Sequence, residues 1–485
     1  RVTGSLSDIT ERRSAESQLI HDALHDGLTG LPNRRLLMDR LAQCLGHLER
    51  DPGYGCAVLY IDIDRFKLVN DSLSHAAGDR LLVVLARRVE GILRRGDTLA
   101  RLGGDEFTIL LDGSSSRAAA VELATRVGDA IAQPIAFDTR TLSIAASIGI
   151  AHNLDGVVDP EELVRNADIA MYEAKARGGG RCEVFDASMH QRVVDRMSLE
   201  GQLREAIEKR RLRTFFQPIV DLRTGALHGL EALARWPAGD RDVAPCEFIP
   251  VAEEAGLIRQ LGTLILREAC QTLADWRGRR VVESDVAVSV NVSVRQITDA
   301  SLVDDVRGAL RDANLPAGNL VLEITESTMI ENPQLVSGVL GEVMALGVGL
   351  HLDDFGTGYS SLTVLHDFAG DALKIDREFV DTMIERIKSE TIIRSIVGLA
   401  HSLELGVIAE GIENADQVDA LTALGCEYGQ GYFFSRPLPA GETEALLAEH
   451  QGTAGRLAYA APSTNWRAAS SRQCASLPRT PARSR

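Results

Sequence analysis

The sequence predicts an α/β protein in which an α/β sandwich is followed by a (β/α)8 barrel. Short apolar runs typical of buried strands recur along the chain, with helical spacing between them. Within residues 231–413 nearly every such run ends on a polar side chain, as the strands of a barrel do at its C-terminal mouth. Residues 213–448, roughly 235 residues, have the size of a single barrel.

The sandwich is predicted from alternating strand and helix patterns in residues 25–187. Residues 57–64 (AVLYIDID) predict a buried strand, and residues 78–93 have helical spacing. Residues 99–111 (LARLGGDEFTILL) predict two strands around a Gly-Gly turn, and residues 142–151 predict a further strand.

A helix is predicted at residues 159–175. Asp159 is its expected cap and Pro160 its first residue. Proline is tolerated there because the backbone N–H of the first helical residue makes no hydrogen bond within the helix. Five small or apolar residues then fall on one face: Leu163, Ala167, Ala170, Met171 and Ala174. The glycine run 178–180 ends the helix.

Three further segments complete the predicted organisation. Residues 188–212 are helical and charged, which indicates a linker between domains. Residues 449–485 contain many Ser, Ala, Pro and Arg and predict a disordered basic tail. Residues 1–24 predict a short extended piece and a helix that leads into the sandwich. The chain starts at Arg1 without Met, so we expect a fragment that lacks upstream residues, and a membrane tether there is left open.

The bulk composition narrows the class of function. The chain has 485 residues and a net charge of −17, which argues against binding to a nucleic-acid duplex. Its seven cysteines are scattered without zinc spacing, which favours reduced thiols and a cytoplasmic location. No apolar run approaches the ~18 residues of a membrane span.

The polar residues at the predicted strand ends suggest a metal-dependent enzyme. Carboxylates gathered at one mouth would repel each other unless divalent cations lay between them. For any single one of these residues, a helix N-cap is the better explanation, but that explanation weakens when eight lie at the same mouth. The set comprises Glu231, Asn291, Glu323, Asp353, Asp354, Lys374 and Glu410, with Glu413 close behind.

The sandwich carries a second acidic constellation. Asp62 ends a predicted strand, and Asp105 lies in the turn of a predicted hairpin. On spacing alone, a helix cap and a tight turn explain these residues at least as well as a magnesium site does. Four ordered blocks, however, resemble the GGDEF family of diguanylate cyclases: HDGLTGLPNRRLL, YIDIDRFKLVNDSLSHAAGD, RRGDTLARLGGDEF and ADIAMYEAKARGGGR.

This resemblance implies a palm-like nucleotide-cyclase fold that condenses two GTP molecules into cyclic di-GMP, which requires two domains facing each other and hence a homodimer. By motif, Asp62, the Ile63 carbonyl and Asp105 would hold metal ions, and Glu106 belongs to the same catalytic turn. Asn70 and Asp79 would bind guanine, and Lys175 the phosphates. Arg94 and Asp97 resemble the product-inhibition site of the family, which binds cyclic di-GMP.

Two positions depart from the family pattern. Gly179 stands where a phosphate-binding arginine is expected, and Ser74 replaces a glycine. Arg177 or Arg181 is a candidate substitute. An arginine restored at position 179 would be expected to add a phosphate contact and raise cyclase activity. The alternative is a domain that binds GTP as a regulator without forming the cyclic product.

The barrel half resembles the EAL family of cyclic di-GMP phosphodiesterases. The motifs stand in order: QPIV, EALARW, NVS, EITE, DDFGTGYSSL, KID, AEGIE and GCEYGQGYFFSRP. The resemblance implies hydrolysis of cyclic di-GMP to pGpG with two Mg²⁺ or Mn²⁺ ions. Glu231, Asn291, Glu323 and Asp353 would hold one ion, and Asp353, Asp354 and Glu410 the other.

The remaining residues of the EAL motifs are expected around these ions. Lys374 would orient the attacking water or stabilise charge, helped by Asp376, and Glu413 would support the DDFGTG loop. Gln217 and Arg235 would meet the substrate backbone, and Gln430 a water or a base. The first 25 residues resemble the end of a PAS sensor domain, which implies a missing upstream sensor. A receptor that binds cyclic di-GMP without cleaving it is a further alternative.

Overall fold

The computed structural model describes residues 19 and 21–451, except for positions 49–53, 114–115, 138–139, 154–158, 240, 300, 332, 357–367 and 369. The chain divides into two compact units, Arg1–Met197 and Ser198–Arg485. The leading segment predicted at residues 1–24 lies mostly outside the described residues. So does the predicted basic tail, apart from residues 449–451.

The front unit is built on a five-stranded sheet in the order β2-β3-β1-β6-β7. The central strand β1 pairs antiparallel with β3 and β6, and β7 runs parallel to β6. A separate hairpin is formed by β4 (Ile135–Phe137) and β5 (Arg140–Leu142). The sheet strands are β1 (Ala57–Ile63), β2 (Thr98–Gly103), β3 (Glu106–Leu111), β6 (Ala146–His152) and β7 (Cys182–Val184).

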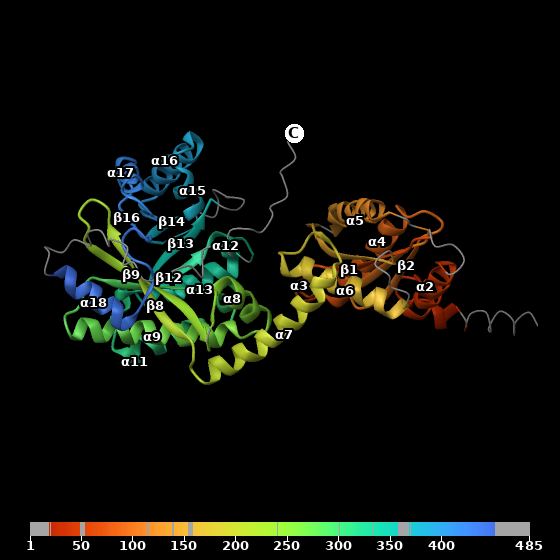
Figure 1. Cartoon of the computed structure of the whole chain (residues 1–485), viewed down its shortest axis with the longest axis horizontal. Coiled ribbons are helices and arrows are strands. Elements are labelled where there is room, and N and C mark those ends of the chain that lie inside the picture. Colours follow the sequence, from red (N-terminus) through yellow and green to blue (C-terminus); the bar gives the residue numbers. More distant parts are fainter. Residues whose placement is uncertain are drawn as a thin grey trace, which may run out of the picture. The chain divides into compact units, whose positions relative to one another are not determined.

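Helices cover both faces of this sheet (Figure 1). Helices α4 (His75–Glu90) and α5 (Arg117–Ala132) pack on the face that carries Leu59 and Ile61. Helices α2 (Arg34–Leu48) and α6 (Pro160–Ala176) pack on the face that carries Val58 and Tyr60. Because side chains alternate along a strand, Asp62 lies on this second face, beside α6.

Most of the elements predicted for this unit are confirmed. The Asp159 side chain accepts a hydrogen bond from the Glu161 amide at 3.3 Å and caps α6, and all five predicted apolar residues are buried. The predicted strand at 142–151 begins later, at Ala146, because residues up to Leu142 pair with β4 instead. The short helix α3 (Phe66–Ser72) follows β1.

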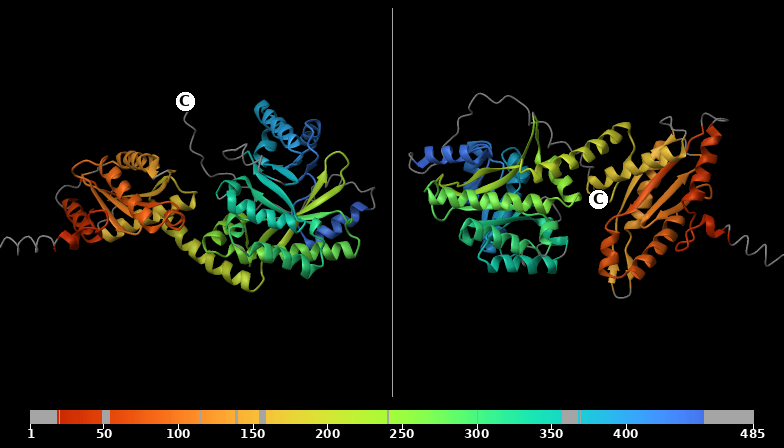
Figure 2. Two further views of the ribbon diagram at one scale, coloured as in Figure 1. Left: turned by 180° about the vertical axis from the view of Figure 1, so that it is seen from behind. Right: turned by 90° about the horizontal axis from the view of Figure 1, so that it is seen from below.

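One continuous helix, α7 (Ala187–Glu208), forms the predicted linker (Figure 2). Near its start, Met189 packs against Ile169 and Ala170 of α6. Near its end, Leu203, Ala206 and Ile207 belong to the core of the second unit. The helix ends before position 212, because Arg210 adopts a left-handed conformation with φ of 49° and the Arg211 amide bonds back to the Ala206 carbonyl.

The second unit contains a closed eight-stranded barrel in the order β9-β11-β12-β13-β14-β15-β16-β8, which closes through a β8–β9 pairing. Strand β8 runs antiparallel to both neighbours, whereas the other ladders of the ring are parallel. Five residues join β8 to β9, too few for the crossover helix that a parallel pair requires. The strands are β8 (Arg213–Asp221), β9 (Leu227–Ala238), β11 (Ala287–Asn291), β12 (Leu320–Thr325), β13 (Gly349–Phe355), β14 (Ala372–Ile375), β15 (Gly406–Ala409) and β16 (Tyr428–Gly429).

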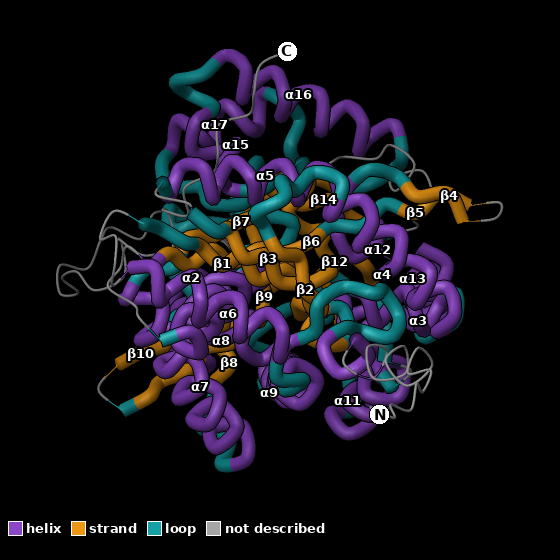
Figure 3. Tube along the Cα trace, turned by 90° about the vertical axis from the view of Figure 1, so that its right-hand side faces the viewer, coloured by secondary structure: helices purple, strands orange, loops and turns teal. Residues whose placement is uncertain are grey.

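The remaining elements surround the barrel, and Figure 3 distinguishes its strands from its helices by colour. Short strands β10 (Arg241–Val243) and β17 (Leu438–Pro439) extend the sheet, and η2 (Ala317–Asn319) is a 3-10 turn. The helices are α8 (Pro245–Glu254), α9 (Ile258–Gly278), α10 (Val294–Ile297), α11 (Leu302–Ala313), α12 (Glu326–Glu331), α13 (Pro333–Ala345), α15 (Arg377–Thr382), α16 (Ile387–Ser402), α17 (Ala415–Ala423) and α18 (Ala440–Gln451). Among the described residues, no helix combines the length and apolar character of a membrane span.

Alternation along the strands separates an apolar shell from a polar barrel interior. In β13, Leu350 and Leu352 join the core between strands and helices, whereas His351 and Asp353 point into the barrel. A small apolar cluster of Ile219, Ala372 and Ile408 closes the interior at one level. Carboxylates and a lysine occupy the strand ends above it.

Candidate active site

The predicted mouth residues of the barrel converge on one buried ammonium group. Lys374 is completely buried, and its Nζ lies 2.6 Å from Glu410 Oε1 and 2.7 Å from Glu323 Oε2. The same nitrogen lies 3.4 Å from Glu231 Oε2 and 3.6 Å from Asp353 Oδ1. Five strands or strand ends therefore contribute to one cluster, because neighbouring parallel strands present their C-terminal ends at the same level.

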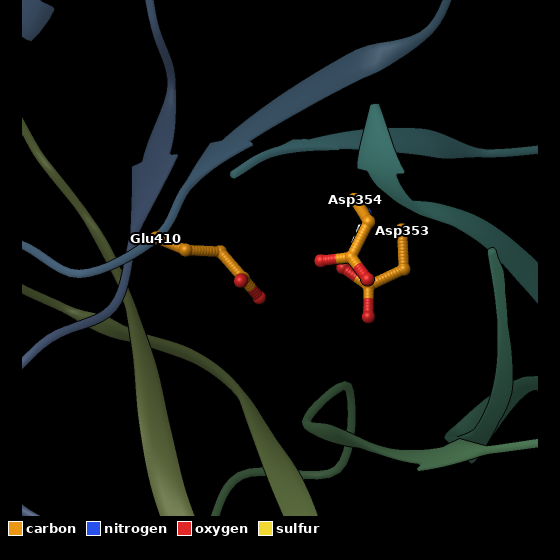
Figure 4. A group of neighbouring side chains, drawn as sticks. All are labelled: Asp353, Asp354 and Glu410. Atoms are coloured by element: carbon orange, nitrogen blue, oxygen red, sulfur yellow. Dashed lines mark hydrogen bonds between the residues drawn. The ribbon is translucent and has the colours of Figure 1, made fainter. Parts of the chain in front are cut away.

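A second group of acids overlaps this cluster. One oxygen each from Asp353, Asp354 and Glu410 lies within 4.8 Å of the others, a spacing that can hold a metal ion. Figure 4 shows the Glu410 side chain directed toward the two aspartates of β13. Asp354 has a left-handed φ of 54°, and the ladder between β13 and β14 shifts register between Leu352 and Phe355. This local distortion lets consecutive aspartates face one point.

The site contains more negative charge than its lysine can neutralise. Four carboxylates contact the Lys374 ammonium group (Glu231, Glu323, Asp353 and Glu410), and the fifth, Asp354, lies beside Asp353 and Glu410. Five acids and one lysine leave four formal negative charges. Burying such an excess is unfavourable unless cations bind or protons are taken up. Two divalent cations would neutralise it. The hard oxygen donors of this set match the ligand preference of Mg²⁺ and Mn²⁺.

The pKa values reflect this crowding. Burial, with the charges of neighbouring acids, raises the pKa values of Glu323 and Glu410 well above the ordinary value. Burial and the Asp353 charge raise the pKa of Asp354 to about 6. For Glu231 burial also acts upward, but the Lys374 ammonium and hydrogen bonds from Gln430 and Asn291 outweigh it and leave its pKa below the ordinary value.

Two amide side chains orient Glu231. Asn291 Nδ2 donates to Glu231 Oε1 at 2.8 Å, and Gln430 Nε2 donates to Glu231 Oε2 at 2.5 Å. Donation through the nitrogen leaves the Asn291 carbonyl oxygen available as a ligand. Gln430, expected at a water or a base, therefore contacts a predicted metal ligand directly.

The predicted substrate residues lie around this cluster with partners of their own. Gln217 Nε2 donates to the Ser435 carbonyl at 3.0 Å. Arg235 donates to the Ala234 carbonyl, and burial lowers the pKa of its guanidinium. Asp376 caps α15 through the Glu378 amide at 2.6 Å, and Glu413 pairs with Arg377 at 2.6 Å.

Three residues near the mouth escaped the sequence reasoning. The Gly356 amide donates to Glu326 Oε2 at 3.3 Å, so the buried Glu326 contacts the start of the DDFGTG segment. Tyr432 is 45% exposed, with Arg436 over its ring at 4.2 Å. His351 lies in the barrel interior, where burial lowers its pKa to about 4. The second glutamate of EITE was the available signal for Glu326. Much of the DDFGTGYSSL segment lies outside the described residues.

The front unit also brings its predicted acids together. Asp62, at the end of β1, pairs in register with Glu106 of β3, and Lys175 Nζ lies 2.7 Å from Asp62 Oδ1. Burial raises the pKa of Asp62 to about 6, with Lys175 acting downward and Asp105 and Glu106 upward. Ile63 closes β1. This site is more open than the barrel cluster, since the Lys175 side chain is 38% exposed.

The remaining predicted residues of the front unit fall into two places. The Asn70 side chain lies against Gly78, next to the exposed Asp79. Arg94 Nε pairs with Asp97 Oδ1 at 3.0 Å within the loop after α4, so these two side chains already contact each other. Ser74 caps α4 by accepting a hydrogen bond from the Ala77 amide.

The two candidate substitutes for the missing arginine differ. Arg177 is paired with Glu183 at 2.9 Å and lies 3.9 Å from Glu173. Arg181 is exposed, and its backbone carbonyl accepts a bond from the Ile148 amide of β6. Arg177 would thus have to give up an ion pair to reach a phosphate.

Comparisons with known proteins agree with this architecture. The EAL domain family matches residues 200–437, and the diguanylate cyclase, GGDEF domain family matches residues 23–181. The bifunctional diguanylate cyclase/cyclic di-GMP phosphodiesterase MucR of Pseudomonas aeruginosa is 41% identical over 90% of this chain and 63% of its own length. An uncharacterized protein of Mycobacterium tuberculosis is 37% identical over 91% of this chain and 70% of its own length.

A solved structure shows the same fold. The S helix–GGDEF–EAL part of Vibrio cholerae LapD, bound to c-di-GMP, matches 87% of this chain and 99% of its own with a TM-score of 0.58, at 18% identity. The chain spans between 53% and 63% of the length of four curated relatives that match it.

Proposed function

Since the chain belongs to the family of tandem GGDEF–EAL proteins, we propose that its barrel hydrolyses one phosphodiester bond of cyclic di-GMP to give pGpG. The observation that carries the proposal is the excess of buried carboxylates around Lys374 and between Asp353, Asp354 and Glu410. The activity that gives MucR its name as a cyclic di-GMP phosphodiesterase, in a relative at 41% identity, supports the choice of substrate.

The residues present fit two divalent cations. Glu231, Asn291, Glu323 and Asp353 would hold one, and Asp353, Asp354 and Glu410 the other. Such a pair would polarise the phosphate and lower the pKa of a bound water. A receptor that does not cleave the ligand is disfavoured, because the complete set of acids that would hold two cations is present.

The protein's own groups then fix geometry and charge. The pKa of Lys374 is raised well above its ordinary value, because the four surrounding carboxylates outweigh its burial, so this side chain stays an ammonium. It would serve as a donor that orients water or balances charge on the phosphate. Asn291 and Gln430 hold Glu231 in one orientation. Gln217 and Arg235 would bind the sugar–phosphate backbone, with Asp376 and Glu413 supporting the surrounding loops.

The front unit is proposed to condense two GTP molecules into cyclic di-GMP. Asp62, Asp105 and the Ile63 carbonyl would hold the ions of this site, and Lys175 the phosphates, with Glu106 beside them. Asn70 and Asp79 would recognise guanine. Two copies of the unit must face each other, so a homodimer is part of the proposal. Arg94 and Asp97 would bind the product as an inhibitor.

A second candidate role for the front unit is regulation by bound GTP without cyclisation. One observation favours it: position 179 is a glycine, and Arg177 is engaged with Glu183. Losing one charge-assisted phosphate contact costs ~1.5–3 kcal/mol, enough to slow condensation strongly while GTP still binds.

One assay separates these roles. Full chain with Mg²⁺ receives GTP in one reaction, cyclic di-GMP in a second and both in a third, and the products are resolved by chromatography. We expect pGpG from cyclic di-GMP, and cyclic di-GMP or its hydrolysis product pGpG from GTP alone if the front unit condenses it. Faster pGpG formation in the third reaction, with neither product formed from GTP alone, would assign the regulatory role. If no cyclic di-GMP is consumed with either Mg²⁺ or Mn²⁺, the proposal for the barrel is wrong.

A further inference from the structure

A three-glycine turn joins α6 to β7 in the front unit, and Asp64 holds it in place. Gly178, Gly179 and Gly180 have φ values of 103°, 69° and 60°, which favour glycine. The Gly180 amide donates to Asp64 Oδ2 at 2.7 Å. The buried Ser147 hydroxyl of β6 donates to Asp64 Oδ1 at 2.7 Å. One carboxylate therefore joins the end of β1, strand β6 and the turn.

The other amides of the turn are bonded within α6. The Gly178 amide donates to the Lys175 carbonyl at 3.0 Å, and the Gly179 amide to the Ala174 carbonyl at 3.1 Å. These bonds continue the end of the helix, whereas the bond to Asp64 ties the turn to the centre of the sheet. All three glycine amides are thus engaged, and none of them is available to a phosphate.

The turn directly follows the helical residue that meets the front-unit acids. Lys175 stands in the last turn of α6, and its Nζ is 2.7 Å from Asp62 Oδ1. Asp62 and Asp64 lie two residues apart at the end of β1. Fixing the turn on Asp64 therefore fixes the end of α6 relative to the strand that carries Asp62.

We propose that Asp64 is a positioning residue of the front-unit site: its carboxylate holds the glycine turn and so places Lys175 where the phosphates of GTP bind. The inference rests on the proposed GTP site. Asp64 acts through the turn and Lys175, and it needs no contact with the nucleotide.

The same carboxylate crowds a side chain at position 179. A Cβ atom placed on Gly179 would lie 2.9 Å from Asp64 Oδ2, so the carboxylate would have to shift. Such a shift would strain the two hydrogen bonds that hold Asp64. A side chain at 179 would therefore weaken the hydrogen bond between Asp64 and Gly180, which is the clamp on this turn.

The test measures binding of α,β-methylene GTP with Mg²⁺ to the full chain by calorimetry. Asp64→Ala removes both contacts, and we expect about tenfold weaker binding. Asp64→Asn should stay within about threefold of the wild type, because its oxygen can accept from Gly180 while its amide donates to the Ser147 hydroxyl. Ser147→Ala removes one of the two contacts, so its affinity for the analogue should lie between those of Asp64→Ala and Asp64→Asn. This variant keeps the test informative if Asp64→Ala does not fold.

Asp159→Ala is the matched control. It removes the cap at the opposite end of α6 and so weakens the same helix without touching the turn. Asp159→Ala should bind the analogue like the wild type. Equal weakening by Asp159→Ala, unchanged binding by Asp64→Ala, or failure of Asp64→Asn to rescue would each overturn the proposal.

A second readout separates this inference from the proposed function. Amide hydrogen exchange at Gly180, measured without nucleotide, should become faster in Asp64→Ala and remain slow in Asp64→Asn. A wild-type chain that binds no analogue would reject the GTP site itself. Unchanged exchange at Gly180 in Asp64→Ala would reject the clamp, whatever the nucleotide result.

Discussion

The two acidic sites of the chain differ in how their lysine is used. In the barrel, Lys374 is completely buried and contacts four carboxylates, so the acids are held together before any ligand arrives. In the front unit, Lys175 is 38% exposed and contacts one carboxylate, that of Asp62, and a glycine turn held by Asp64 follows its helix. The difference teaches that the barrel is pre-organised for cations, whereas the front site leaves the Lys175 ammonium group partly exposed, where a phosphate can reach it.

Removing the buried ammonium group of Lys374 should have the largest effect on the stability of the barrel. Lys374→Met leaves the carboxylates without a counter-charge, and breaking such a buried network costs about 3–5 kcal/mol. We expect a much lower melting temperature in EDTA, partly restored by Mn²⁺, and loss of pGpG formation. Lys209→Met, which removes an exposed ion pair with Glu205, is the control and should melt like the wild type. Equal melting of both variants in EDTA would contradict the central role of Lys374.

Loss of one barrel ligand should stop hydrolysis without unfolding the barrel. Glu231→Gln keeps the shape of the side chain and removes its charge, so we expect pGpG formation to fall by more than about a hundredfold, beyond what outer-shell changes cost. The rate is measured by chromatography and folding by circular dichroism. A variant that produces pGpG at the wild-type rate would show that Glu231 is not a metal ligand.

Cation affinity of the barrel should rise with pH. The folded pKa of Asp354, about 6, lies above its ordinary value of 3.8, so the folded chain holds a proton that the unfolded chain has lost between these values. The stability that Asp354 contributes to the metal-free protein therefore declines as pH rises from about 4 to 6. Over the same range, the affinity of the barrel site for Mn²⁺ increases. Titrations with Mn²⁺ at pH 5 and pH 7 test this, and equal affinities would contradict it.

For an arginine at position 179, the sequence and the structure predict opposite effects on cyclase activity. The sequence favours a gain in cyclase activity, but the left-handed backbone and the Asp64 carboxylate oppose the substitution. We expect Gly179→Arg to lower the free energy of unfolding of the front unit by about 1–2 kcal/mol, with no gain in cyclic di-GMP formation. Increased formation of the product at unchanged stability would contradict the clamp.

Arg94→Ala should have the smallest effect on the folded chain. Its guanidinium is largely exposed, and the buried Asp97 carboxylate keeps a hydrogen bond from the Arg94 backbone amide, so we expect about 1 kcal/mol of lost stability. Any cyclase activity should nevertheless lose its inhibition by added cyclic di-GMP. Inhibition curves of the variant and the wild type decide this, and identical curves would reject the inhibitory site.

The sequence predicted the barrel and the front sandwich because strands and helices leave local patterns. Apolar runs ending on Glu231, Asn291, Glu323 and Asp353 indicated which side chains would share one mouth. The antiparallel direction of β8 could not be predicted in this way, because an apolar run marks a buried strand and not the direction in which it runs beside its neighbours.

Contacts between distant segments could not be read from local patterns. Gln430 reaches Glu231 across 199 positions, and Gly180 reaches Asp64 across 116. The central place of Lys374 likewise depends on how four other strands close around it. Such contacts follow from the packing of the whole unit and leave no spacing in the sequence.

The most direct test counts Mn²⁺ ions bound per chain in the wild type, Asp353→Asn and Asp62→Asn, using calorimetry on the full chain. We predict two ions at the barrel that Asp353→Asn loses and Asp62→Asn retains, because Asp353 takes part in both proposed cation positions. Equal ion counts in the wild type and Asp353→Asn would contradict the account.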